Sequence, residues 1–199
     1  DPITHMHASE SELAHKLVEI ARGSVWFMDA LATVHQLGLR QWCIGAGAVR
    51  NLVWDFLHGK LSPSNLSDVD VAYFDPSDVS AARDQALQDQ LRMLRPSVPW
   101  EVTNQAGVHH WFEGHFGHAV EPLTSLHEAV ASWPEFATAV GLSLDHDNAL
   151  RVIAPHGLED LFAITIRRNP TRVSIETYRE RVAQKRYAER WPLVRVVPC

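Results

Sequence analysis

Apolar residues three or four positions apart alternate along this chain with short runs in which every second residue is apolar, a pattern typical of helices and strands that share one core. A first helix is expected after a cap at Ser9 or Ser11, and a second from Ser24 to Gly38. Strands are predicted at Gln41–Ile44, Asp68–Phe74, Trp100–Thr103, Gly141–Asp145 and Ala149–Ala154, the last two as a hairpin. Later helices are predicted from near Ala48 to Gly59 with Phe56 on the buried face, from Ser77 or Asp78 to Pro96, from Asn104 through Phe112, after Ser125, and over Leu158–Arg168 and Ser174–Arg190. This mixture predicts an α/β (α+β) fold.

A glycine turn, Gly45-Ala46-Gly47, links the first strand to an amphipathic helix. Glycines let a backbone approach a ligand closely, and the amides at a helix N-terminus point at anions. We therefore predict a phosphate site at this turn. Arg50, one turn into the helix, would add a forked cation, and Asn51 would contact a phosphate or the turn itself.

The next strand opens with two acids, Asp68 and Asp70. Side chains two apart on a strand share one face, so these carboxylates can converge on one divalent ion or on a pair of ions, while Val69 faces the core. The strand after that presents Glu101 on the face that also carries Thr103. Glu101 is a candidate third carboxylate, and a solvent-facing glutamate is the alternative.

These features together resemble the DNA polymerase β-like nucleotidyltransferase superfamily, whose mark is a small glycine turn, a helix and a strand carrying Asp-x-Asp. The run from Ala46 to Asn51 is similar to the Gly-Gly-x-Val-Arg-Asp run of the tRNA CCA-adding and poly(A) polymerase branch. It departs from that run at both ends, with Ala46 in place of the first Gly and Asn51 in place of the Asp. Residues 100–106, 131–140 and 154–162 are similar to a bacterial family of small nucleotidyltransferase-like proteins of unknown substrate. The resemblance covers roughly residues 41–192 and implies the nucleotidyltransferase fold, a small mixed β-sheet flanked by helices.

The resemblance also implies an activity, the transfer of a nucleoside monophosphate from an NTP to an acceptor with release of pyrophosphate. Asp68, Asp70 and Glu101 would be catalytic and would hold Mg²⁺ or Mn²⁺, with Glu101 as a candidate to take the proton. Gly45, Ala46, Gly47, Arg50 and Asn51 would bind the nucleotide phosphates. The alternative is a catalytically inactive nucleotide-binding or protein-interaction module on the same fold.

Charge is distributed unevenly along the chain. The formal net charge of −6 argues against a broad grip on nucleic acid. Residues 167–199, however, contain nine Arg or Lys and three Glu. This segment can be a solvated basic helix docked on an acidic body, or it can contact a phosphate-bearing acceptor. The acceptor is not identified by the residues, but a small molecule or a protein is favoured over a long nucleic acid.

Length and composition predict one domain. With 199 residues and 46% hydrophobic content, the chain can bury one core, which we expect to span residues 6–199, with 157–199 as a helical C-terminal extension. Asp1–His5 resemble vector-derived residues ahead of Met6. No apolar run reaches the ~18 residues of a membrane span. Cys43 and Cys199 make no disulfide framework, so we expect a cytoplasmic protein without a membrane partner.

The glycine turn also has a rival interpretation. Gly45-x-Gly47 followed by an acid roughly 20 residues later is similar to the fingerprint of dinucleotide-binding folds. Arg50 occupies the place of the third glycine, and the acids open a strand as a pair, so the rival is disfavoured.

Histidines are concentrated in residues 109–118, HHWFEGHFGH. Zinc sites favour His pairs spaced for one helical face or one turn, and His115 with His118 meets that spacing only loosely. Structural or surface roles are therefore expected for this segment, with contact to a base or sugar as the alternative.

Overall fold

The computed structural model describes residues 8–199, so the predicted vector residues at 1–5 and Met6 lie outside the described part. The helices are α1 (Glu10–Arg22), α2 (Val25–His35), α3 (Gly47–Leu57), α4 (Ala81–Leu94), α5 (His109–Phe116), α6 (Leu126–Ala131), α7 (Glu159–Phe162), α8 (Ile175–Lys185) and α9 (Tyr187–Arg190), with 3₁₀ turns η1 (Gln105–Gly107) and η2 (Phe136–Thr138). The strands are β1 (Trp42–Gly45), β2 (Val69–Tyr73), β3 (Trp100–Asn104), β4 (Gly141–Leu144), β5 (Leu150–Ile153), β6 (Thr165–Ile166) and β7 (Arg195–Val196).

The main sheet is mixed, which confirms the predicted fold class. Its strands lie in the order β3-β2-β1-β4-β5. β1 is antiparallel to both of its neighbours, β2 and β3 are parallel, and β4 and β5 form the predicted hairpin. Because β1 and β2 run antiparallel, the chain lacks the parallel strand–helix–strand unit that a dinucleotide-binding fold requires around its glycine turn. The rival interpretation is therefore wrong.

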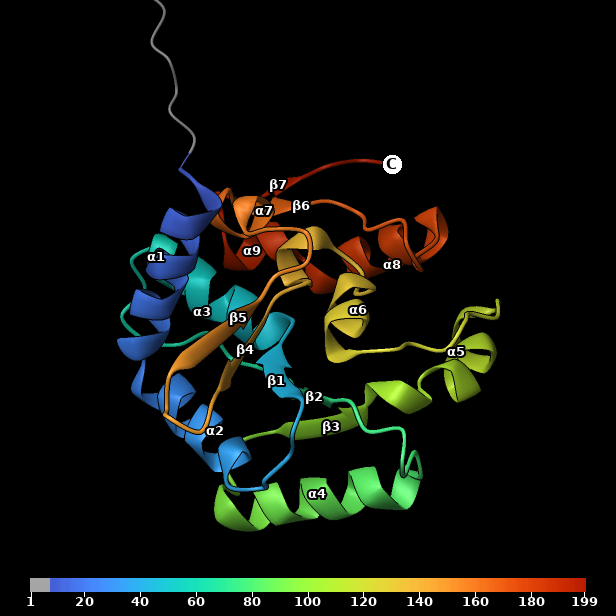
Figure 1. Cartoon of the computed structure of the whole chain (residues 1–199). Helices are drawn as coiled ribbons and strands as arrows, with labels where there is room; N and C mark the ends of the chain where they lie inside the picture. The colour runs from blue at the N-terminus through green and yellow to red at the C-terminus, as the bar shows by residue number, and fades with distance from the viewer. Residues whose placement is uncertain (1–7) are drawn as a thin grey trace, which may run out of the picture.

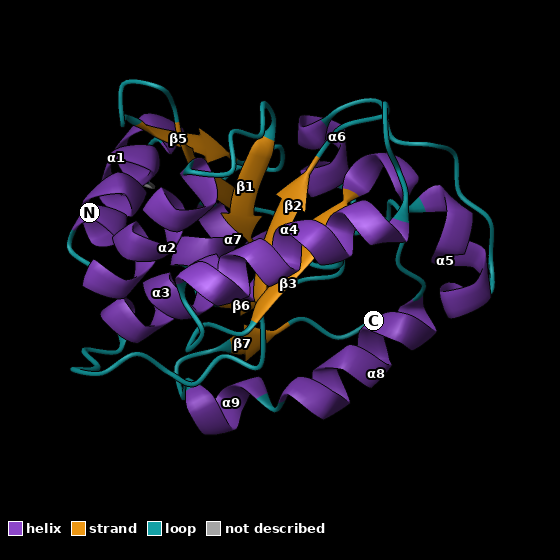
Figure 2. Cartoon of the chain, turned by 90° about the horizontal axis from the view of Figure 1, so that it is seen from below, coloured by secondary structure: helices purple, strands orange, loops and turns teal. Residues whose placement is uncertain are grey.

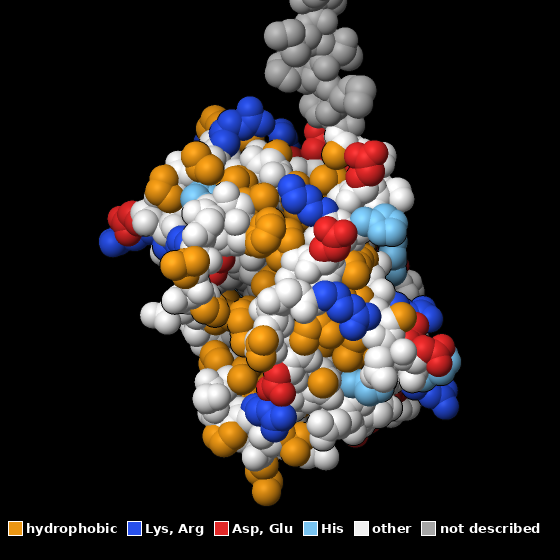
Figure 3. All heavy atoms as spheres, turned by 90° about the vertical axis from the view of Figure 1, so that its left-hand side faces the viewer, with side chains coloured by type: hydrophobic (Ala, Val, Ile, Leu, Met, Phe, Trp, Pro, Cys, Tyr) orange, Lys and Arg blue, Asp and Glu red, His pale blue; other side chains and the backbone are white. Residues whose placement is uncertain are grey.

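Helices cover the sheet from several sides. In Figure 1, α1 and α2 lie along one side, α4 lies below β3, and α7 to α9 lie at the opposite end. Figure 2, seen from below, shows α4 lying across β3 and the pair α8 and α9 away from it. The side seen in Figure 3 carries hydrophobic side chains interspersed with acidic and basic ones. None of the helices in residues 8–199 is long and apolar enough to cross a membrane.

Strand periodicity fixes which side chains of β2 enter the core. As predicted, the main hydrophobic cluster buries Val69, Val71 and Tyr73. The same cluster also contains Trp54 and Trp100. The alternate positions of β2 are thereby turned toward the opposite face of the sheet. The core thus holds the strand that carries the acids in a fixed orientation.

Several predicted helix boundaries were wrong for local reasons. α4 starts only after Ser80, whose hydroxyl accepts a hydrogen bond from the backbone N–H of Arg83. The residues before it form turns instead, because Asp75 and Asp78 accept the backbone N–H groups of Ser77 and Ser80. Phe56 is 57% exposed rather than buried. By contrast, Ser9, Ser24 and Ser125 each accept a backbone N–H at the predicted start of a helix.

The C-terminal region departs most from the expected helices. α7 ends at Phe162 because Ile164 adopts a left-handed backbone (φ 51°), and the following residues pair with β7 instead of continuing the helix to Arg168. The helix expected up to Arg190 is divided at Arg186, which is also left-handed (φ 48°). A helix was also predicted from Asn104 through Phe112. Asn104 instead caps the short 3₁₀ turn η1, and α5 then extends from His109 to Phe116.

Candidate functional site

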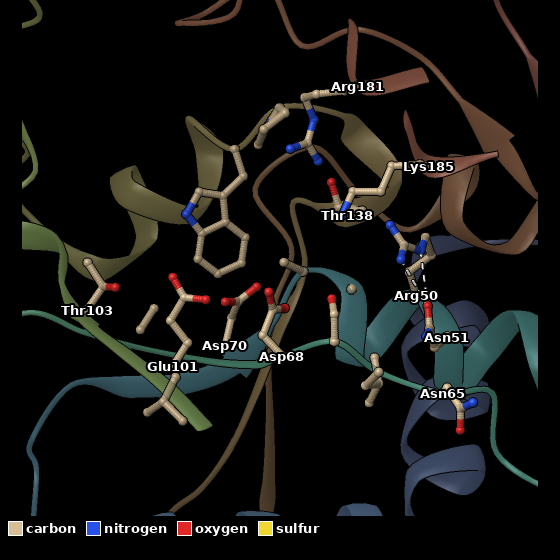
Figure 4. A pocket seen from close by; sticks show the side chains of 18 of the residues that line it. Arg50, Asn51, Asn65, Asp68, Asp70, Glu101, Thr103, Thr138, Arg181 and Lys185 are labelled. Carbon is tan, nitrogen blue, oxygen red and sulfur yellow. Dashed lines mark hydrogen bonds between the residues drawn. The ribbon is translucent and has the colours of Figure 1, made fainter. Parts of the chain in front are cut away.

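Three carboxylates converge at the edge of the sheet where β2 and β3 begin. Asp68 immediately precedes β2, Asp70 lies within it, and Glu101 lies in β3. Asp70 and Glu101 are paired in the parallel register. One oxygen from each of the three side chains lies within 4.8 Å of the others, and Figure 4 shows the carboxylates side by side. The structure therefore brings together the three predicted acids.

The carboxylates repel one another in a partly buried setting. Burial, followed by the negative charges of Asp68 and Glu101, raises the pKa of Asp70 to about 7. Burial also raises the pKa of Glu101, with Asp68 as the second cause. Oxygen ligands at this spacing suit a hard divalent cation, whose charge would relieve the repulsion. The donor set thus fits Mg²⁺ or Mn²⁺.

The acids form one wall of a cavity of about 310 Å³. The predicted phosphate-binding residues Ala46, Gly47, Arg50 and Asn51 line the same cavity. Gly45 does not. A Cβ at Gly45 would lie 2.6 Å from the ring of Trp133, so this glycine is needed for close packing against a tryptophan that lines the cavity. Of the predicted phosphate-binding residues, Gly45 is the one that the structure keeps away from the cavity.

The turn keeps a glycine-like backbone although one glycine is replaced. Ala46 has φ 54° and ψ −125°, a conformation that L-residues rarely adopt. Its N–H donates to the carbonyl of Val140 at 3.2 Å, which ties the turn to the segment before β4. α3 then starts at Gly47. The strained alanine therefore places a helix N-terminus, with its free amides, at the cavity.

The side chain of Arg50 is almost entirely buried and lies among three aromatic side chains. Its Cζ lies 5.3 Å from the ring centroids of both Tyr187 and Trp191, and 6.0 Å from that of Trp54. The guanidinium donates through Nη2 to Oδ1 of Asn51 at 3.0 Å. Burial lowers the pKa of Arg50. Within residues 8–199 no carboxylate forms an ion pair with this cation.

Asn51 leaves a buried donor free. Its side chain is 1% exposed, and Nδ2 has no hydrogen-bond partner in the described residues. Leaving a buried donor unpaired costs about 1–3 kcal/mol. A cavity lined by this amide, by the unpaired cation of Arg50 and by a helix N-terminus fits an anionic ligand.

Further cations line the cavity from the C-terminal helices, and sequence reasoning did not identify them individually. Arg181, Lys185 and Arg190 all contribute to its wall, and Figure 4 shows the first two across the cavity from the carboxylates. Burial lowers the pKa of Lys185, and the charges of Arg181 and Arg50 lower it further. The excess of basic residues in 167–199 indicated that the C-terminal segment carries cations, but it did not indicate which side chains face the acids.

One of these cations is held in place by a buried acid. Glu135 is completely buried, and its Oε1 accepts a hydrogen bond from Nε of Arg181 at 2.9 Å. Oε2 accepts from the hydroxyl of Thr138 at 2.9 Å, and Tyr187 lies within 3.4 Å of Oε1. The ion pair therefore fixes α8 over the cavity.

The comparisons with known proteins agree with this geometry. A family model described as nucleotidyltransferase matches residues 32–196. A solved structure reported to reveal a CCA-adding enzyme head domain superimposes with a TM-score of 0.79 and 31% identity, covering 93% of this chain and 96% of that one. No curated protein matched in the search.

Larger enzymes share the fold at lower identity. The Thermotoga maritima CCA-adding enzyme, solved with tRNA, gives a TM-score of 0.54 at 12% identity, with 93% of this chain covered and 42% of that one. A CCA-adding enzyme in complex with CTP gives 0.52 at 12% identity, with 93% and 43% covered. This chain thus spans less than half the length of these two enzymes. With a matching family model over most of its length and a head-domain relative matched almost end to end, this chain belongs to the nucleotidyltransferase family.

Proposed function

We propose that the protein transfers a nucleoside monophosphate from an NTP to an acceptor hydroxyl in a reaction that depends on Mg²⁺ or Mn²⁺. The observation that carries the proposal is the cavity itself. Three carboxylates spaced for a divalent cation lie opposite a helix N-terminus and several cations in a cavity of about 310 Å³. A metal–triphosphate complex needs both kinds of wall at once.

Asp68, Asp70 and Glu101 would hold the metal. When two divalent ions are bound between such acids, they supply charge neutralisation for the triphosphate and activation of the attacking oxygen. The raised pKa values of Asp70 and Glu101 support this assignment, because burial and the neighbouring acids disfavour their negative charge, which a divalent cation between them would compensate.

The glycine turn and the cations would bind the triphosphate. Backbone amides at Gly47, with Arg50 and Asn51, would hold the triphosphate from one side, and Lys185 would hold it from the other. Positioning of this kind is the main contribution that a protein makes to phosphoryl transfer. The acceptor oxygen would attack the α-phosphorus, its proton would pass to a carboxylate oxygen of Glu101, and the bond to pyrophosphate would break.

The acceptor is proposed to be a small molecule or a protein. Two similar structures are complexes with tRNA, but their chains are longer and are similar to this one at only 12–19% identity. The net charge of −6 disfavours a long nucleic acid.

Substitution of the third carboxylate tests the proposal. In Glu101→Gln the proton acceptor is removed, so we expect NTP binding to persist while pyrophosphate release falls by at least 100-fold. Glu113→Gln, an exposed position on α5, is the matched control. If wild type and Glu101→Gln both bind NTP and neither releases pyrophosphate in the presence of protein and small-molecule acceptors, the inactive binding module is the better account.

A further inference from the structure

A second cavity opens beside the carboxylates. It has a volume of about 260 Å³ and is enclosed by β3, η1, α5, residues 132–134 after α6, residues 172–173 and the start of α8. Glu101, Thr103, Gln105, Trp133 and Arg181 line both this cavity and the first one. A molecule in the second cavity would therefore reach Glu101 directly.

The second cavity lies on the side of the acids away from the phosphate site. No residue of the glycine turn or of α3 is among those that enclose it. In Figure 4, Thr103 and Glu101 lie on one side of the two aspartates, and Arg50 lies on the other. In a two-metal displacement the attacking and leaving oxygens are stabilised on opposite sides of the reacting phosphorus. The second cavity is thus placed for the acceptor, while the first holds the triphosphate.

Four aromatic side chains contribute to its walls. Trp111, Phe112, Phe116 and Trp133 all face it. Phe112 and Phe116 have ring centroids 4.6 Å apart, and Trp111 is 48% exposed. Aromatic walls with a few polar groups are typical of sites that bind flat, largely apolar ligands. The volume gives room for a molecule of one or two rings.

One charged group in the wall has an unused donor. Nη1 of Arg172 is buried and has no hydrogen-bond partner in residues 8–199, although Nη2 donates to the carbonyl of Glu121. The guanidinium lies over Phe112, with Cζ 5.8 Å from the ring centroid. A buried, unpaired guanidinium nitrogen favours a ligand that brings a carboxylate or phosphate oxygen.

From this arrangement we propose that the second cavity is the acceptor site, and that the acceptor is a small molecule with a hydroxyl, an aromatic ring and an anionic group. The inference builds on the proposed function. The ring would lie between the aromatic walls and the anion would pair with Arg172. The hydroxyl would lie at Glu101, where its oxygen forms the new bond to the α-phosphorus, its proton passes to the carboxylate, and pyrophosphate leaves.

Binding of defined probes tests the site without turnover. The probes are 3-hydroxybenzoate, 4-hydroxyphenylacetate and phenyl phosphate, with the neutral 2-(4-hydroxyphenyl)ethanol for comparison, measured by ligand-observed NMR on the full chain. We expect at least one anionic probe to saturate wild type and to bind at least fivefold more weakly to Arg172→Gln. Arg179→Gln, an exposed arginine on α8, should bind as wild type does. Thr177→Phe, which enlarges a side chain that lines the cavity, should abolish probe binding.

The same variants separate this inference from the proposed function. Thr177→Phe and Arg172→Gln should bind Mg-NTP as wild type does, because neither residue lines the first cavity. If no anionic probe binds wild type, or if probe affinity is the same in wild type, Arg172→Gln and Thr177→Phe, the acceptor site is refuted even where Mg-NTP binds. Displacement of a bound probe by NTP alone would also refute it, because the cavity would then hold the base of the nucleotide. Saturable binding of a short RNA that Thr177→Phe abolishes, without binding of any probe, would replace the small-molecule acceptor with an RNA end.

Discussion

Asp70 on β2 and Glu101 on β3 lie directly opposite each other in a parallel strand pair, so two acids are held as neighbours by backbone register. Like charges directly opposite each other on a sheet destabilise it. Asp68 adds a third charge within 4.8 Å. The fold therefore maintains a repulsive arrangement that a bound divalent cation would relieve.

Replacing Asp70 by Asn should stabilise the metal-free protein. The substitution keeps the shape and removes a charge that burial and two neighbouring acids disfavour. Relief of about 1 kcal/mol would raise the melting temperature by about 2–4 °C in EDTA. Asp89→Asn, exposed on α4, should leave it within about 1 °C. A clear loss of stability in Asp70→Asn would mean that this carboxylate has a structural partner.

Lys185 should contribute to nucleotide affinity and not to the fold. Replacement by Met keeps the stem of the side chain but removes a cation from the wall opposite the acids. A hydrogen bond from a charged group contributes about 1.5–3 kcal/mol, so Mg-NTP should bind about tenfold or more weakly in a calorimetric titration. Lys16→Met, exposed on α1, provides the control, and equal affinities in the two variants would exclude Lys185 from the phosphate site.

Glu135 should be among the most sensitive positions for stability. Its completely buried carboxylate is paired with Arg181 at 2.9 Å, so Glu135→Ala leaves that guanidinium without its acid. Removal of one partner of a buried pair typically costs about 3–5 kcal/mol. The salt bridge from the exposed Arg151 to Asp145 offers a contrast, since Arg151→Ala should cost less than about 1 kcal/mol. Urea denaturation of both variants measures the difference, and similar midpoints would contradict this account of α8.

Two glycines should respond to alanine in opposite directions. A Cβ at Gly141 would lie 2.6 Å from Sγ of Cys43, whereas one at Gly114 would meet nothing within 4 Å. Overpacking at Gly141 should cost about 1–3 kcal/mol. In the middle of α5, Gly114→Ala should gain up to about 1 kcal/mol from helix propensity. Thermal melting of the two variants checks the signs, and a Gly141→Ala protein as stable as wild type would show that Cys43 moves freely.

The part of the site that depends on local order was predictable from sequence. Period-two alternation places Asp68 and Asp70 together. The position of Glu101 beside them depends on the parallel pairing of β2 and β3, which local periodicity does not predict. Arg181 and Lys185 were not predictable in this way, because their position depends on the docking of α8 by a buried acid 46 residues earlier in the chain.

Backbone conformation accounts for the other differences. The left-handed residues Ala46, Ile164 and Arg186 are types that rarely adopt positive φ, so no glycine or asparagine marks these points in the sequence. At Ile164 and Arg186 they interrupt predicted helices, whereas at Ala46 the flanking glycines Gly45 and Gly47 had already predicted a turn. Tertiary contacts, rather than local propensity, hold these conformations.

The metal-dependent nucleotide site at the three carboxylates can be tested by calorimetric titration of ATP and CTP into wild type and Asp70→Ala, each with Mg²⁺ and with EDTA. We expect saturable binding to wild type that requires Mg²⁺ and that disappears in Asp70→Ala, while circular dichroism shows the variant to be folded. Binding of equal affinity in EDTA, or in Asp70→Ala, would contradict a metal site at the three carboxylates. Absence of binding of either nucleotide to wild type would favour the inactive interaction module.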